Sequence, residues 1–181
     1  MDTTKVVSTK VVIPNVRFSY AHVFEPVAIE EGQTKKYSVS IIIDKSDTAT
    51  IATIKKAIEA ALEQGKAKLG GKIPATYKNP LRDGDAERPD DEAYENSYFI
   101  NANSTRKPGI VDANLQEVMR QDEFYSGCYG RASVNFYAFN VSGNRGVAAG
   151  LQNLQKQKDG DRLSGGSSAA DDFGKDDDDF M

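Results

Sequence analysis

Cysteine, histidine and long hydrophobic runs are scarce or missing in this sequence of 181 residues. Cys128 is the only cysteine, so no disulfide can form within the chain, which favours a reducing, cytoplasmic setting. No run of about 18 apolar residues is present, so no membrane span is expected. The first residues, MDTTK, lack the apolar core of a secretory signal peptide. We therefore expect a cytoplasmic protein with no membrane partner.

Motifs for metals, nucleotides and covalent catalysis are missing as well. The sequence has no His/Cys spacing for zinc, no DxDxDG calcium loop, no P-loop, no GxGxxG and no GxSxG. His22 is the only histidine and lies in strand-like sequence without a nucleophile motif, so a packed or surface residue is the better interpretation. We expect a protein that is not an enzyme and that uses no cofactor and no metal.

Negative charge is concentrated in one stretch, DDFGKDDDDFM at 171–181. It holds six Asp and one Lys and carries −5, whereas the whole chain carries −4, so residues 1–170 carry +1. Such a stretch cannot bury enough apolar surface to fold, so we expect a disordered tail. The sequence pI near 5.1 therefore does not exclude a locally basic groove for nucleic acid. Acidic tails often serve only solubility, but Phe180 is an aromatic suited to anchoring a partner.

Strand signals dominate the rest of the chain. The β-rich stretch 5–24 is interrupted by a turn signal at Pro14-Asn15, and residues 35–43 alternate as a half-buried strand. Further strands are expected over 97–103, 127–141 and 146–156, although the last could also be helical. One helix is predicted, capped by Ser46 or Asp47, with one core-facing side. That side is formed by Ile51, Ile54, Ile58 and Leu62.

These elements predict a mainly β fold, an OB-fold-like barrel of five to six strands with one helix. A β-sandwich is the alternative. Residues 72–96 form a long acidic excursion punctuated by proline and glycine. After Lys158 the composition turns to Gly, Ser, Ala and Asp, so we expect a domain over 1–158 and a linker with the tail over 159–181.

The run GCYGRASVNFYAFN at 127–140 has the clearest chemical pattern. Alternate residues give a small, apolar face suited to a barrel interior, and a second face that mixes aromatic, cationic and hydrogen-bonding groups. Single-stranded nucleic acid needs that mixture, because rings stack on unpaired bases and cations follow the phosphates. An amphipathic edge strand covering a second small core is the competing interpretation. The candidate residues on this face are Tyr129, Arg131, Asn135, Tyr137 and Phe139.

Further cations and rings add to the candidate site without locating it. Lys107 precedes Pro108-Gly109 and so projects from a loop together with Arg106. For each cation taken alone, a solvated surface charge is the simpler interpretation. The remaining candidates for DNA contact are Tyr77, Lys78 and Tyr98.

Four segments together resemble the single-stranded DNA-binding proteins of bacteriophages that combine an OB-fold with an acidic, Phe-bearing tail. They are YFINANSTRKP at 98–108, GCYGRASVNFYAFN, GVAAGLQNLQKQ at 146–157 and DDFGKDDDDFM. The resemblance implies a protein of the bacterial host cytoplasm that coats single strands during phage replication and recombination and promotes annealing. It also implies a tail that contacts replication or recombination proteins through Asp176, Asp177, Asp178, Asp179 and Phe180. The sequence ends in Met181, so the aromatic residue is penultimate.

Two other functions remain as alternatives. A metal-dependent nuclease would use the carboxylates of the acidic excursion, but two-metal chemistry needs carboxylates fixed a few ångströms apart, and a loop rich in proline and glycine holds them poorly. Its candidate ligands are Asp83, Asp85, Asp90, Asp91 and Glu92. A scaffolding protein would act through the tail alone. The sequence leaves open whether the protein is a homodimer.

Overall fold

The computed structural model describes residues 8–28 and 31–163. The predicted acidic tail lies outside the described residues. The elements, in chain order, are β1 (Lys10–Val27), β2 (Lys36–Asp44), α1 (Thr48–Gln64), β3 (Arg82–Asp83), α2 (Gly84–Glu87), the 3-10 helix η1 (Glu92–Tyr94), β4 (Ser97–Ser104), β5 (Gly109–Val111), β6 (Tyr129–Val141) and β7 (Asn144–Lys158). In the described part of the chain, no helix is long and apolar enough to cross a membrane.

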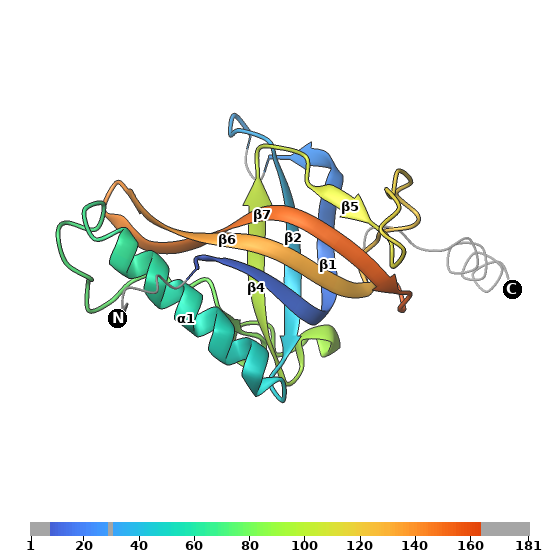
Figure 1. The fold of residues 1–181 in the computed structure, drawn as a ribbon, viewed down its shortest axis with the longest axis horizontal. Coiled ribbons are helices and arrows are strands. Elements are labelled where there is room, and N and C mark those ends of the chain that lie inside the picture. The colour runs from blue at the N-terminus through green and yellow to red at the C-terminus, as the bar shows by residue number, and fades with distance from the viewer. Residues whose placement is uncertain (1–7, 29–30, 164–181) are drawn as a thin grey trace, which may run out of the picture.

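Five strands close into a barrel (Figure 1). The sheet order is β3-β4-β2-β1-β6-β7-β5, and a parallel pairing between β4 and β7 closes the ring of β4, β2, β1, β6 and β7. That pairing is short, matching Ala102 with Ala149 and Asn103 with Gly150. The short strands β3 and β5 extend the sheet beyond the closed ring. The architecture confirms the expected OB-fold-like barrel with one principal helix.

The first strand is shared by the two halves of the barrel. β1 pairs with β6 over residues 10–17 and with β2 over residues 17–27. The turn expected at Pro14-Asn15 is instead a bulge, at which the register shifts and Asn15 adopts a φ of 55°. Proline fits a bulge because its missing N–H removes no ladder bond there, and the extra residue bends the strand. The bend allows one strand to serve both halves.

Helix α1 packs against the barrel with the predicted face. Ile51, Ile54, Ile58 and Leu62 are all buried. The helix begins after Asp47, whose carboxylate accepts a hydrogen bond from the Thr50 amide at 3.3 Å. It ends at Gly65, where a β-carbon would lie 2.3 Å from Cβ of Ala138, so glycine allows the helix end to approach β6 closely.

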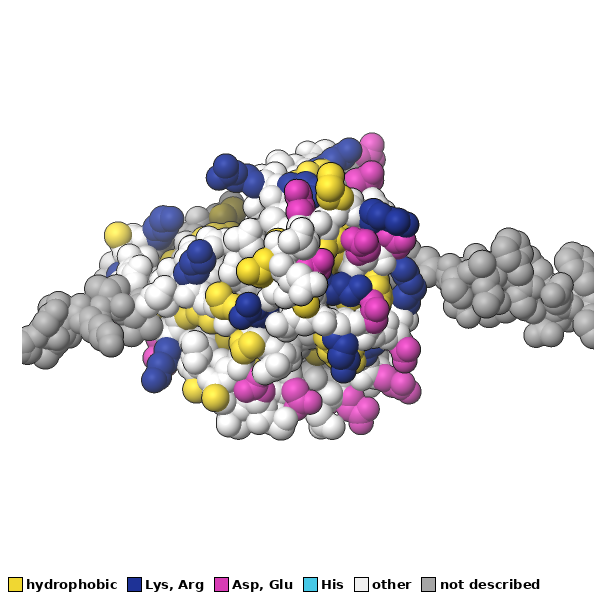
Figure 2. Space-filling view, turned by 45° about the vertical axis from the view of Figure 1, so that its right-hand side comes forward, with side chains coloured by type: hydrophobic (Ala, Val, Ile, Leu, Met, Phe, Trp, Pro, Cys, Tyr) yellow, Lys and Arg dark blue, Asp and Glu magenta, His cyan; other side chains and the backbone are white. Residues whose placement is uncertain are grey.

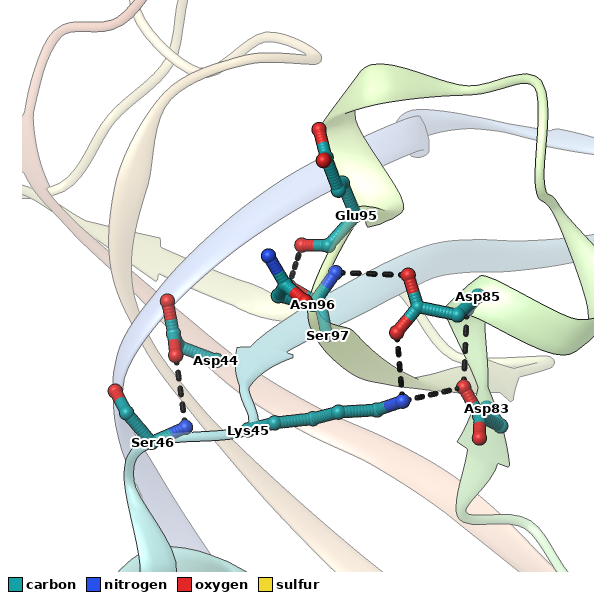
Figure 3. Close-up of polar contacts among 8 residues, drawn as sticks. All are labelled: Asp44, Lys45, Ser46, Asp83, Asp85, Glu95, Asn96 and Ser97. Atoms are coloured by element: carbon teal, nitrogen blue, oxygen red, sulfur yellow. Dashed lines mark hydrogen bonds and ion pairs between the residues drawn. The ribbon is translucent and has the colours of Figure 1, made fainter.

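The acidic excursion is folded onto the outer side of β2 and β4. Figure 3 shows the Lys45 ammonium donating to Asp83 at 2.8 Å and to Asp85 at 2.7 Å. Tyr94 is fully buried, and its hydroxyl donates to Ser40 at 2.8 Å. Its ring meets Phe99 edge-on at 5.1 Å. The excursion therefore covers one end of this face of the barrel and leaves the other end open.

Candidate nucleic-acid interface

Strand β6 has the two faces that its sequence predicted. From residue 130 to residue 138, every even-numbered residue is buried, and every odd-numbered residue from 129 to 139 is partly or fully exposed. The alternation is confirmed because the inner face fills the barrel while the outer face meets solvent. Tyr137 is the most exposed aromatic of this strand, with 41% of its surface accessible.

Small residues border the Tyr137 ring on the outer face. Tyr137 pairs with Ala148 on β7, and a β-carbon at Gly150 would lie 3.6 Å from the tyrosine ring. Gly150 in turn pairs with Asn103 on β4. Ala148, Gly150 and Asn103 are all half-buried, and Asn101 beyond them is exposed. This arrangement gives an exposed ring beside a flat floor, with amide groups on the opposite side.

A groove of about 580 Å³ adjoins this floor and shares Asn101 and Ala148 with it. β4 and β7 pair at only two positions, and the segment 78–83 forms a wall beside them. The wall is attached to β7 because the Lys78 amide donates to the Arg145 carbonyl at 2.9 Å and the Val147 amide donates to the Lys78 carbonyl at 3.0 Å. The groove is lined by Lys78, Asn79, Pro80, Leu81, Arg82, Asp83, Glu87, Asn101, Phe139, Val147, Ala148 and Ala149.

The two ends of the groove differ in charge. At the β4 end, Asp83 is paired with Lys45 and Arg82 is paired with Glu87. The Lys45 ammonium, by donating a hydrogen bond to each, holds the pKa of Asp83 and of Asp85 below the usual aspartate value. At the other end, Lys78 has no ion pair with any residue in the described ranges. Free positive charge therefore faces the groove only at its Lys78 end.

Of the five predicted residues of β6, Phe139 alone belongs to the lining of this groove. Tyr137 and Asn135 line a separate hollow with Lys68, and Tyr129 and Arg131 lie farther along the strand. The Tyr129 ring has Arg17 at 5.1 Å and Lys158 at 4.9 Å from its centre, next to the segment 159–163. Tyr129 is eight residues from Tyr137, which corresponds to about 26 Å along a strand. Arg131 is exposed and donates to the side chain of Gln155 on β7.

The predicted loop cations lie at a third place. Arg106 and Lys107 are exposed after β4, and the Lys107 ammonium lies 5.2 Å from the centre of the Phe24 ring. The Arg106 amide donates to Ser104 Oγ at 3.0 Å, which stabilises the turn. These two cations belong to the loop end of β4 and not to the lining of the groove.

The two remaining tyrosines face away from the groove floor. Tyr98 pairs with the buried Ile43 and shares a strand face with Ile100, so its ring packs against the core, with Lys45 at 5.2 Å. Tyr77 is also partly buried against the core. The structure thus places Phe139 and Lys78 in the lining of the groove, and it places Tyr137 beside Ala148, which belongs to that lining. Asn135 lies next to that floor, accepting a hydrogen bond from Thr9 at 2.8 Å.

Sequence reasoning missed the floor itself. Its members are Asn101, Asn103, Ala148 and Gly150. The signal available was the alternation Asn101-Ala102-Asn103, in which only the central residue is apolar. Small residues such as Ala148 and Gly150 carry no chemical signature of their own, so only the pairing of strands identifies them.

Three of the five candidate carboxylates of the acidic excursion have structural partners. Asp83 and Asp85 converge on Lys45, and Asp91 accepts a hydrogen bond from the Ala93 amide at 3.1 Å. Within the described ranges, no group of three or more His, Cys, Asp or Glu side chains is placed to hold a metal ion. The tail residues Asp176, Asp177, Asp178, Asp179 and Phe180 lie outside the described residues.

Comparisons with known proteins place this geometry in context. A family model described as the ssDNA-binding protein of Enterobacter phage Enc34 matches residues 9–181. Protein p50 of Acyrthosiphon pisum secondary endosymbiont phage 1 is 34% identical over 171 residues, which span 89% of this chain and 90% of the relative.

Solved structures share the fold. The single-stranded DNA-binding protein of bacteriophage Enc34, in complex with ssDNA, matches with a TM-score of 0.78 and 23% identity over 86% of this chain and 90% of the other. A single-stranded DNA-binding protein encoded by bacteriophage T7 matches with a TM-score of 0.56 and 12% identity over 90% and 93% of the two chains.

Proposed function

The chain belongs to the family of phage single-stranded DNA-binding proteins represented by that of Enterobacter phage Enc34, and we propose that it binds single-stranded DNA along the groove between β4, β7 and the segment 78–83. The ligand is an unpaired strand because the groove offers a ring and a flat floor, which suit exposed base faces. Bases in a duplex are stacked on each other and cannot reach such a surface.

One observation carries the proposal: Tyr137 is an exposed ring beside small residues on the outer face of β6. The exposed part of this ring is free to meet a ligand, and a base stacked on it contributes about 1–3 kcal/mol to binding. Phe139 and Asn101 line the groove, and Tyr137 pairs with Ala148 of its lining, so stacking and hydrogen-bonding groups lie within reach of one strand. Lys78 supplies a cation for a phosphate at its end.

The test is a titration of the purified protein with labelled single-stranded and double-stranded oligonucleotides in the presence of Mg²⁺. Binding of the single strand with little binding of the duplex, and with no cleavage, is the expected result. Cleavage of the oligonucleotide would favour the nuclease instead. Absence of binding to either form would leave only a scaffolding role and would refute the proposal.

We further propose that the protein coats and protects single strands in the bacterial host cytoplasm, and that it supports phage replication, recombination and annealing. The acidic segment 171–181 would contact replication or recombination proteins, with Phe180 as the aromatic anchor. With −5 of charge, the same segment would compete with DNA for the groove. A tethered competitor acts at an effective concentration on the order of millimolar, so even weak intrinsic affinity lowers the apparent affinity for DNA.

A further inference from the structure

An ordered unit lies at one end of the molecule, where the turn between β6 and β7 meets the segment that follows α1 (Figure 1). We call residues 65–79 and 137–148 the basic arm. Two side chains join its parts: Asn140 donates to the Lys68 carbonyl at 3.1 Å, and Arg145 donates to the Leu69 carbonyl at 3.1 Å. The backbone bonds between Lys78 and β7 complete the attachment. The arm is therefore held to the barrel as one piece.

The charge of the basic arm is of one sign. It contains four Lys and one Arg and no Asp or Glu, so it carries +5. The whole chain carries −4 and residues 164–181 carry −5, so residues 1–163 carry +1 in total. Outside the arm, residues 1–163 therefore carry −4. A strongly positive end on an otherwise negative body is an electrostatic footprint for a polyanion. The cations are Lys66, Lys68, Lys72, Lys78 and Arg145.

Most of these cations have no carboxylate partner. Lys66 pairs with Glu63 at 2.9 Å at the end of α1. For Lys68, Lys72 and Lys78 the described part of the chain provides no ion pair. Gly70 and Gly71, with φ values of 96° and 93°, turn the chain between Lys68 and Lys72. The lysines are exposed to solvent and free to bind an anion.

The groove leads into the arm. Lys78 belongs both to the groove lining and to the arm. The opposite end of the groove meets Asp83 and Glu87 and then the acidic excursion. A phosphate chain in the groove is therefore attracted toward Lys78 and repelled from the far end. Figure 2 shows, on one face, Lys and Arg interspersed with hydrophobic side chains, and Asp and Glu spread over the right-hand side and the lower margin.

We propose that the basic arm binds the sugar–phosphate backbone of the single strand where it leaves the groove, and so extends the binding site. This inference rests on the proposed function of the groove. From Tyr137 to the turn at Gly143 the arm adds six residues, about 20 Å of strand. At about 3.4 Å per stacked nucleotide, that length accommodates up to about six phosphates. The arm recognises charge, so it adds affinity without base preference.

The experiment compares two oligonucleotide lengths, one of about five nucleotides that fills the groove and one of about twenty that also reaches the arm. The test variant is Lys68→Gln/Lys72→Gln. The matched control is Lys55→Gln/Lys56→Gln, which removes the same charge from the exposed side of α1. For a single strand, the logarithmic salt slope is about −0.7 per phosphate contact, so losing two contacts flattens the slope by about 1.4.

The expected result is a flatter salt slope and weaker binding of the long oligonucleotide by the arm variant alone, with unchanged binding of the short one. Equal effects of the arm and control variants, or equal effects on both lengths, would overturn the inference. The same comparison is made with the chain ended after Leu163. If the arm variant then binds the long oligonucleotide as well as the unchanged protein does, the arm binds the acidic segment and not DNA, which also overturns the inference. Failure of the unmodified protein to bind either length would instead refute the groove.

Discussion

Replacing Tyr137 by alanine isolates the contribution of base stacking to binding. The ring is 41% accessible and lies on the outer face, so its loss leaves the core intact and changes the free energy of unfolding little. A base stacked on a protein ring is worth about 1–3 kcal/mol. Since about 1.4 kcal/mol is a factor of ten, the middle of that range raises the Kd for single-stranded DNA about thirtyfold. Fluorescence anisotropy with a labelled oligonucleotide measures the change.

Two control variants separate stacking from other effects of that substitution. Tyr137→Phe keeps the ring and should bind within about twofold of the unchanged protein, because stacking needs the π face and not the hydroxyl. Tyr20→Ala removes a ring from a residue that is 44% accessible but lies against Arg88 on another part of the surface, so it should leave affinity unchanged. A Tyr137→Ala protein that is folded, as judged by thermal unfolding, and binds like the unchanged protein would refute the stacking argument.

Three further predictions concern the ion pairs of Lys45, the close packing of β6 on β7, and the acidic tail. Lys45→Met should lower the Tm most above pH 3.8, the ordinary pKa of aspartate. The difference in Tm should vanish as acid protonates Asp83 and Asp85 through their depressed pKa, because the stabilisation requires their charged form. A difference in Tm that persists in acid would contradict a stabilising role of this ion pair. Gly130→Ala places a β-carbon 1.8 Å from the Gln155 carbonyl oxygen, so urea unfolding should show that the free energy of unfolding falls by about 1–3 kcal/mol. An unshifted unfolding midpoint would argue against this close approach of β6 and β7. Ending the chain after Ala170 should tighten DNA binding most at low salt, where screening is weakest; unchanged or weaker binding in that titration excludes competition by the tail.

Local patterns predicted much of the fold. The helix face with Ile54 and Ile58 and the alternation of β6 depend on side-chain spacing within one element, which the sequence displays directly. The run at 146–156 was ambiguous between strand and helix because its apolar residues are small and closely spaced. Pairing with β6 over its whole length decides for the strand. The pairing with β6, and not the conformational preference of the local sequence, determines the structure of this run.

Features that depend on distant pairings were not predictable in the same way. The groove exists because β4 pairs with β7, whose paired residues lie 47 positions later in the sequence, and no local signal specifies that parallel pairing. Tyr98 was chosen for its ring, but its register opposite Ile43 turns that ring to the core. The Pro14-Asn15 pair has the composition of a turn but forms a bulge, because Ile13 before it and Val16 after it both pair with β6 and keep the strand extended.

The central claim, that single-stranded DNA lies in the groove between β4, β7 and the segment 78–83, is tested most directly by ultraviolet cross-linking. A thymidine-rich oligonucleotide is cross-linked to the intact protein, and the modified peptides are mapped by mass spectrometry. The account predicts adducts on Tyr137 and Phe139, which competing unlabelled single-stranded DNA suppresses. Adducts confined to Tyr129 or to residues 112–125, with none on Tyr137 or Phe139, would contradict it.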